Sequence, residues 1–191
     1  LCLDTSSGGE LALALRAQVP GANIALHGNN KSEAEIDRAI RNGLGRVVAD
    51  SVDELKLIER VYAELDAERV AEGEEPYAPV PVLIRITPGV HASTHESIAT
   101  AHEDQKFGMS LQPGTAALAG LEEEELKHWG VESTDSYAAL AAAILNATDS
   151  LDFRGIHCHI GSQIFEAEGF EQAATTALEF MNRLNRDLGM T

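Results

Sequence analysis

The feature that most constrains the fold of this chain is a repeated alternation of short β-branched runs with longer segments of helical periodicity. The short runs occupy residues 1–4, 23–26, 46–49, 80–86 and 151–160. Helical patterns begin at about residue 9 and cover residues 33–42, 52–65, 137–147 and 170–188. An alternating β-α-β-α order predicts a parallel sheet with helices packed outside it.

Two of the helices are expected to begin at capping boxes. In Ser32-Glu33-Ala34-Glu35 and Ser51-Val52-Asp53-Glu54, a serine is followed three residues later by a glutamate. The hydroxyl and the carboxylate can then bond each other's backbone N–H groups. Gly43 is a natural stop for the first of these helices.

The segments between these elements are polar. We interpret residues 68–79 as an acidic surface insertion, residues 88–105 as a long functional loop and residues 122–125 as an exposed helix face.

Two architectures contain such a sheet, namely the open doubly wound sheet and the closed (β/α)8 barrel of the TIM type. No Gly-x-Gly-x-x-Gly motif follows any predicted strand, which argues against a dinucleotide-binding doubly wound sheet. Each strand instead ends in polar residues, and the active sites of barrels collect at the carboxyl ends of their strands. These polar residues are found at positions 5–7, 27–29, 50–51, 85 with 87, and 157 with 159. We therefore predict an α/β fold, a (β/α)8 barrel of which about five strand–helix units are present.

Composition excludes several classes of partner. A formal net charge of −17 over 191 residues is unsuited to a phosphate backbone, so we expect no nucleic-acid partner. No apolar run approaches the roughly 20 residues that cross a bilayer, so we expect no membrane partner. Cys2 and Cys158 lie in apolar stretches, which favours buried thiols over a disulfide and a reducing, cytoplasmic location.

The strongest chemical signal lies at the end of the fifth predicted strand. His157 and His159 alternate across one residue, so both should project from the same face of a strand. Gly161 lets the backbone approach an anion, and Ser162 can donate a hydrogen bond to it. The imidazole of His159 can stack on a planar ring. The alternative is a packed strand with hydrogen-bonded core histidines.

The same two histidines also permit a second function, that of a metal-dependent barrel hydrolase. Imidazoles are common zinc ligands, and His27, His91, His95 or His102 could complete the set. No aspartate at a strand end accompanies the pair to accept a hydrogen bond from it, as carboxylates next to metal-bound histidines usually do.

Two further candidates lie on earlier strands. Arg85 stands between Ile84 and Ile86, and a buried guanidinium must be paired, either with a ligand or with a neighbouring acid. The run His27-Gly28-Asn29-Asn30-Lys31 is either a binding loop or a surface loop that a helix cap closes.

Taken together, these motifs resemble those of the bacterial diaminopimelate decarboxylases over nearly the whole chain. The His27-Gly28-Asn29-Asn30-Lys31-Ser32 motif is the narrowest of them. Within the motif His157-Cys158-His159-Ile160-Gly161-Ser162-Gln163, the part from His159 to Gln163 recurs in related arginine and ornithine decarboxylases. Further matches lie at residues 7–11, 94–96 and 102–108.

The resemblance implies an alanine-racemase-like barrel that binds pyridoxal phosphate, followed by a C-terminal β domain, in an enzyme expected to be a homodimer. The family decarboxylates meso-diaminopimelate, a small amino-acid substrate, to L-lysine and CO2. Carried over by position, His159 stacks on the pyridine ring, Ser162 contacts the phosphate and Arg85 lies near the ring. No metal is implied.

The resemblance also indicates what residues 1–191 do not contain. It places the Schiff-base lysine of the family just before Leu1, and Lys31 and Lys106 match other family positions. We therefore expect a partial pyridoxal-phosphate-binding barrel domain, without the start of the barrel or the C-terminal β domain, and inactive by itself.

Overall fold

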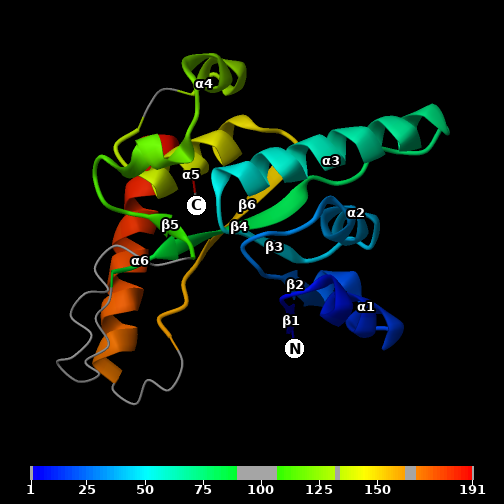
Figure 1. Cartoon of the computed structure of the whole chain (residues 1–191), viewed down its shortest axis with the longest axis horizontal. Coiled ribbons are helices and arrows are strands. Elements are labelled where there is room, and N and C mark those ends of the chain that lie inside the picture. The colour runs from blue at the N-terminus through cyan, green and yellow to red at the C-terminus, as the bar shows by residue number, and fades with distance from the viewer. Residues whose placement is uncertain (1, 90–106, 132–133, 162–166, 191) are drawn as a thin grey trace.

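In a computed structural model, which describes residues 2–89, 107–131, 134–161 and 167–190, the chain forms one parallel sheet flanked by helices (Figure 1). The sheet follows the order β1-β2-β3-β4, and both the short β5 and the long β6 pair with β4. The strands are β1 (Leu3–Thr5), β2 (Ile24–Leu26), β3 (Arg46–Ala49), β4 (Val80–Thr87), β5 (Met109–Ser110) and β6 (Leu151–His157).

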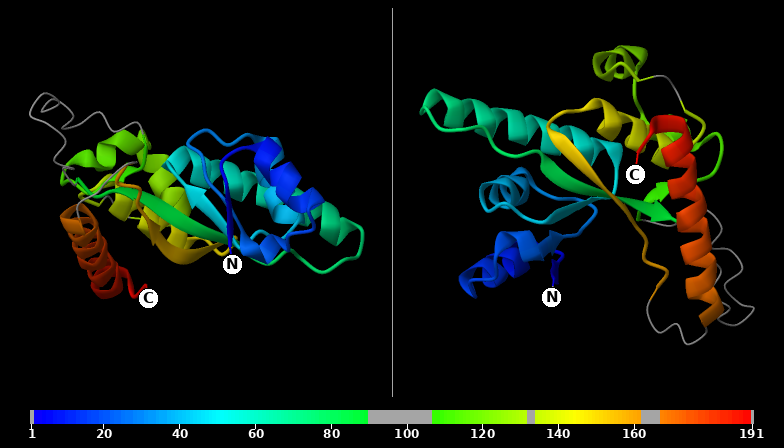
Figure 2. Two further views of the ribbon diagram at one scale, coloured as in Figure 1. Left: turned by 90° about the horizontal axis from the view of Figure 1, so that it is seen from below. Right: turned by 180° about the vertical axis from the view of Figure 1, so that it is seen from behind.

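Helices connect the strands in the order that the alternating pattern predicts. The α-helices are α1 (Gly8–Arg16), α2 (Glu33–Arg41), α3 (Val52–Ala71), α4 (Glu123–Trp129), α5 (Tyr137–Ala147) and α6 (Ala167–Leu188). Two short 3-10 helices, η1 (Gly21–Asn23) and η2 (Thr115–Ala119), precede β2 and follow β5. Figures 1 and 2 show α1, α2 and α3 side by side along one flank of the sheet, with α6 at the end away from α1. Within the described residues, no helix has the length and apolar character needed to traverse a bilayer.

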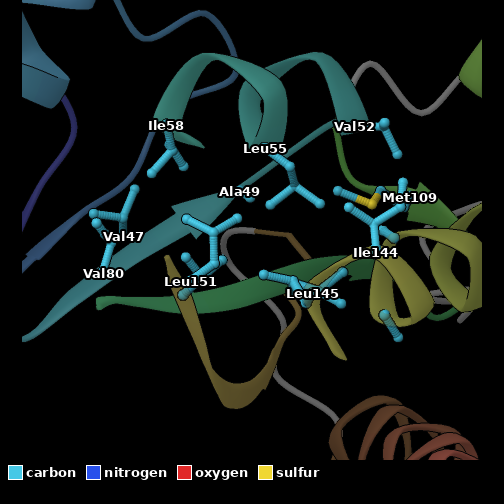
Figure 3. Packing of buried hydrophobic residues seen from close by; sticks show 14 of the residues in the cluster. Val47, Ala49, Val52, Leu55, Ile58, Val80, Met109, Ile144, Leu145 and Leu151 are labelled. Atoms are coloured by element: carbon cyan, nitrogen blue, oxygen red, sulfur yellow. The ribbon is translucent and has the colours of Figure 1, made fainter. Parts of the chain in front are cut away.

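The core lies between the sheet and the helices. Leu55 and Ile58 of α3 point toward β3 and β4, and Ile144 and Leu145 of α5 pack beside them (Figure 3). All four side chains are almost completely excluded from solvent. Removal of apolar surface from water is therefore what fixes these helices against the sheet.

The two faces of β4 have different environments. Val82, Ile84 and Ile86 alternate along one face and are buried in the core. Arg85 lies between the last two and projects from the opposite face. In the register with β6, Arg85 is the partner of His157, so these two polar residues are neighbours at the carboxyl end of the sheet.

The predicted α/β fold with a parallel sheet is confirmed, and several elements match closely. The helix at Tyr137–Ala147 and the strand at Arg46–Ala49 have the predicted bounds. The capping box at Ser32 is present in both directions, and Gly43 follows the helix with a φ of 57°.

Two predicted boundaries are wrong. The strand expected over residues 151–160 ends at His157, where its ladder with β4 also ends. The insertion expected from residue 68 begins later, because Glu68 to Ala71 continue α3. Glu68, Arg69 and Ala71 are good helix formers, and the helix ends only before Gly73.

The environment of one of the two cysteines also differs from expectation. Cys2 is exposed, and its sulfur accepts a hydrogen bond from Nη1 of Arg46 at 3.3 Å. Cys158 packs against the core, and burial raises the pKa of its thiol. Both thiols are free.

Candidate functional site

Five strands bring polar side chains together at the carboxyl edge of the sheet. Because the strands are parallel, their carboxyl ends share one edge. The side chains gathered there are Asp4 on β1, His27 after β2, Asp50 after β3, Arg85 on β4 and His157 on β6.

Two histidines from strands that are not sheet neighbours meet at this edge. The rings of His27 and His157 lie 5.0 Å apart between centroids, edge to face at 69°. Nε2 of His27 lies 3.5 Å from Oδ1 of Asp4. β2 and β6 are therefore brought together by the curvature of the sheet, as they would be in a barrel.

His157 is held neutral by its surroundings. Burial, followed by the nearby His27, Arg85 and His159, lowers the pKa of His157 to about 4. Its Nδ1 is buried and has no hydrogen-bond partner among the described residues. The ring can therefore contribute an uncharged polar surface but not a charge near neutral pH.

Arg85 is the cation of the site, and an acid holds it in place. Its Nη1 donates to Oδ1 of Asp50 at 3.2 Å, and its guanidinium lies over the ring of Phe107 at 4.9 Å. The second oxygen of Asp50 accepts from the backbone N–H of Gly108 at 3.0 Å. Arg85 therefore has the neighbouring acid that was one of the two partners expected from its sequence context.

A buried ion pair lies directly behind this edge. The ammonium of Lys31 donates to Glu54 at 2.9 Å and to the carbonyls of Gly28 and Val48 at 2.5 and 2.6 Å. Glu54 also accepts from the backbone N–H groups of Lys31 and Asp50, at 3.1 and 2.8 Å. Burial lowers the pKa of Lys31, and its pairing with Glu54 opposes that shift.

The capping box predicted at Ser51 is therefore only half correct. The Ser51 hydroxyl accepts from the N–H of Glu54 at 3.2 Å, as predicted. The Glu54 carboxylate does not accept a hydrogen bond from the backbone N–H of Ser51. It accepts from the Lys31 ammonium and from the backbone N–H of Asp50. Since the three donors of its ammonium are all used, Lys31 is a structural residue of the loop that follows β2.

The predicted site residues differ in where they lie relative to the carboxyl-edge site. Arg85 lies in the site, and His159 lies two residues beyond the end of β6 and is exposed. Hence only His157 of the expected pair lies within a strand. Ser162, His91, His95 and His102 lie outside the described residues.

Sequence reasoning missed Asp4 and the role of Glu54. Asp4 was visible as a charged residue at the end of an apolar strand. Glu54 was assigned to a local cap, and only the fold brings Lys31 to it.

The alternative of a metal site at His157 and His159 receives no support from the geometry. Within residues 2–89, 107–131, 134–161 and 167–190, no group of three or more histidine, cysteine, aspartate or glutamate side chains could hold a metal ion.

Comparison with known proteins identifies relatives for the entire chain. The family model described as "Pyridoxal-dependent decarboxylase, pyridoxal binding domain" matches residues 1–133 and 122–191. The diaminopimelate decarboxylase of Corynebacterium efficiens is 42% identical over 191 residues, which are 100% of this chain and 34% of that protein. The diaminopimelate decarboxylase of Mycobacterium tuberculosis is 40% identical over 189 residues, or 99% of this chain and 35% of that protein.

Solved structures of diaminopimelate decarboxylases are also similar to this chain. Diaminopimelate decarboxylase from M. jannaschii in complex with L-lysine matches with a TM-score of 0.70 and 28% identity, over 96% of this chain and 35% of that one. The enzyme from Helicobacter pylori complexed with L-lysine matches with a TM-score of 0.67 and 26% identity, over 96% and 38%. The chain thus spans about a third of the length of the relatives it matches. None of these relatives supports a metal-dependent hydrolase.

Proposed function

Because this chain belongs to the pyridoxal-dependent decarboxylases, through their pyridoxal-binding domain, we propose that it forms part of a diaminopimelate decarboxylase. Residues 1–191 would supply part of the barrel that binds pyridoxal phosphate, and the complete protein would convert meso-diaminopimelate to L-lysine and CO2. The observation that carries this proposal is the identity of 40–42% to diaminopimelate decarboxylases over the whole chain.

The residues at the carboxyl edge fit a planar, anionic cofactor. Arg85 supplies a cation that is 16% exposed at the side chain, and a guanidinium has further donors besides the Nη1 that Asp50 occupies. The neutral His157 has a buried Nδ1 without a partner among the described residues, which marks an edge whose polar groups are incompletely satisfied. Gly161, with a φ of 119°, permits the backbone geometry of an anion-binding turn.

Three side chains would hold the cofactor. The exposed imidazole of His159 would present its face to the pyridine ring, Ser162 would donate to the phosphate, and Arg85 would stand near the ring. When bound, pyridoxal phosphate supplies an electron sink for the electron pair left behind as CO2 departs. The neutral His157 would line the site without adding a second cation beside Arg85.

The remaining properties of the complete protein follow the same proposal. Its substrate would be a small amino acid, and it would act as a cytoplasmic homodimer. The two free thiols support a reducing compartment. The net charge of −17 supports the absence of a nucleic-acid partner.

The test uses the complete protein that carries this chain. Purified enzyme with pyridoxal phosphate should release CO2 and form L-lysine from meso-diaminopimelate, in preference to L-ornithine and L-arginine. Exhaustive chelation of metals should leave that activity intact. A preference for ornithine or arginine would refute the proposed substrate, and loss of activity on chelation would refute the proposed chemistry.

A variant at His159 tests the proposed contact. His159→Ala should weaken cofactor retention by about twofold to tenfold, because aromatic stacking contributes on the order of 0.5–1.5 kcal/mol. His128→Ala is the control, since His128 lies on α4, outside the carboxyl-edge site. Equal cofactor affinity in the two variants would remove His159 from the site.

A further inference from the structure

We propose that Asp50 is a positioning residue, which fixes the guanidinium of Arg85 in the orientation that the cofactor site requires. This inference rests on the proposed role of Arg85 near the cofactor. The observation behind it is a carboxylate with one oxygen on the arginine and the other on the backbone N–H of the residue just before β5.

The two carboxylate oxygens of Asp50 accept hydrogen bonds from different donors. Oδ1 accepts from Nη1 of Arg85 at 3.2 Å, and Oδ2 accepts from the N–H of Gly108 at 3.0 Å. Asp50 is 7% exposed, so water competes little for either oxygen. A carboxylate bonded through both oxygens has little rotational freedom, and it transfers that restriction to the guanidinium.

The anchor at Gly108 is itself rigid. Gly108 has a φ of 85°, and a Cβ at this position would lie 3.0 Å from Oγ1 of Thr87 and 3.1 Å from the carbonyl carbon of Ile86. Only glycine lets the backbone lie this close to β4 with its N–H directed at Asp50. The anchor is therefore part of the fold and does not depend on Arg85.

The backbone of Asp50 is fixed as well. Its N–H donates to Oε2 of Glu54 at 2.8 Å, and the same oxygen accepts from Lys31. Two cations and two anions therefore lie in a row, with no net charge, in the order Lys31, Glu54, Asp50 and Arg85. Removal of the negative charge of Asp50 leaves the positive charge of Arg85 without its partner.

The ring of Phe107 also restricts the orientation of Arg85. The ring of Phe107 lies 4.9 Å from Cζ of the guanidinium, while Asp50 binds at its edge. Phe107 contacts the plane of the guanidinium and Asp50 contacts its edge. These two contacts determine the orientation of Arg85 before any ligand binds.

The experiment measures the dissociation constant of pyridoxal phosphate from the complete apoenzyme, together with kcat and KM. Asp50→Asn should weaken cofactor binding about tenfold, because a hydrogen bond to a charged group is lost. Asp53→Asn is the matched control, since the Asp53 carboxylate is exposed and lies 3.8 Å from Lys56 on the same helix. Asp53→Asn should bind the cofactor as the wild type does.

A double-variant cycle separates positioning from a general structural effect. If Asp50 acts through Arg85, then Asp50→Asn combined with Arg85→Gln should bind the cofactor no more weakly than Arg85→Gln alone. Additive losses would overturn the proposal, since they would mean that Asp50 acts independently of Arg85. Wild-type affinity in Asp50→Asn would overturn it as well, while leaving the proposed function intact.

Two further outcomes complete the test. If Arg85→Gln binds the cofactor normally, the role of Arg85 fails and the proposal for Asp50 fails with it. If Asp50→Asn does not fold, Asp50→Glu retains the charge but displaces it by one methylene. Weakened cofactor binding in folded Asp50→Glu supports positioning, and unchanged binding contradicts it.

Discussion

Replacement of Lys31 by methionine tests whether the buried ion pair behind the site stabilises the fold. Lys31 and Glu54 are each 5% exposed, and all three ammonium hydrogens have acceptors within 2.9 Å. Methionine fills much of the same volume but donates nothing. Lys31→Met therefore leaves a buried carboxylate and the carbonyls of Gly28 and Val48 without this donor.

The expected magnitude follows from this geometry. Removal of one partner from a buried ion pair costs about 3–5 kcal/mol, because the remaining charge is uncompensated. Glu54 retains the backbone N–H groups of Lys31 and Asp50, which favours the lower end of that range. With a urea m value of about 3 kcal/mol/M, the midpoint should fall by about 1 M.

The assay is equilibrium urea unfolding of the complete protein. Lys127→Met is the matched control, because Lys127 is 72% exposed at the side chain and pairs with Glu123 at only 3.6 Å. That change should cost less than about 1 kcal/mol. The double variant Lys31→Met with Glu54→Gln should recover part of the loss, since it removes the uncompensated charge. Equal midpoints for Lys31→Met and Lys127→Met would refute the reasoning.

Two other predictions concern His157 and Gly108. Because the pKa of His157 is lowered from 6.5 to about 4, the unfolded chain binds more protons between these values, so stability falls as pH drops through this window. His157→Gln should reduce that pH dependence in urea midpoints, and an unchanged slope would contradict it. Gly108→Ala should cost more than Gly114→Ala, about 2 kcal/mol against about 1 kcal/mol, since both have positive φ but only Gly108 would contact β4. Similar thermal stability of the two variants would count against that contact.

The comparison of two similar serine motifs shows how far sequence reasoning reaches. Ser32 and Ser51 are both followed by glutamate three residues later, and both serines cap a helix. Glu35 completes the first box, whereas Glu54 is bonded to Lys31 instead. Local spacing predicts a helix start correctly, but it does not predict a buried charge from another loop that competes for the same carboxylate.

In the candidate site, too, some features could be predicted from the sequence and others could not. The polar ends of the strands, among them Asp50, Arg85 and His157, were predictable because parallel strands align their carboxyl ends. The bond between Asp50 and Arg85 was not, since it depends on the register of β3 against β4. The end of β6 at His157 likewise does not follow from the apolar run of residues 151–160.

The strand order has a consequence for how the chain folds during synthesis. Each of the first three pairings joins strands that are consecutive in sequence, so β1 to β4 can associate in the order in which they leave the ribosome. The ladder between β4 and β6 must wait for residues 88–150. Because each doubling of a loop costs only about 0.6 kcal/mol of closure entropy, this delay is set by the time of translation more than by the free energy of closure. Until β6 arrives, the edge of β4 with which it pairs is open to chaperones.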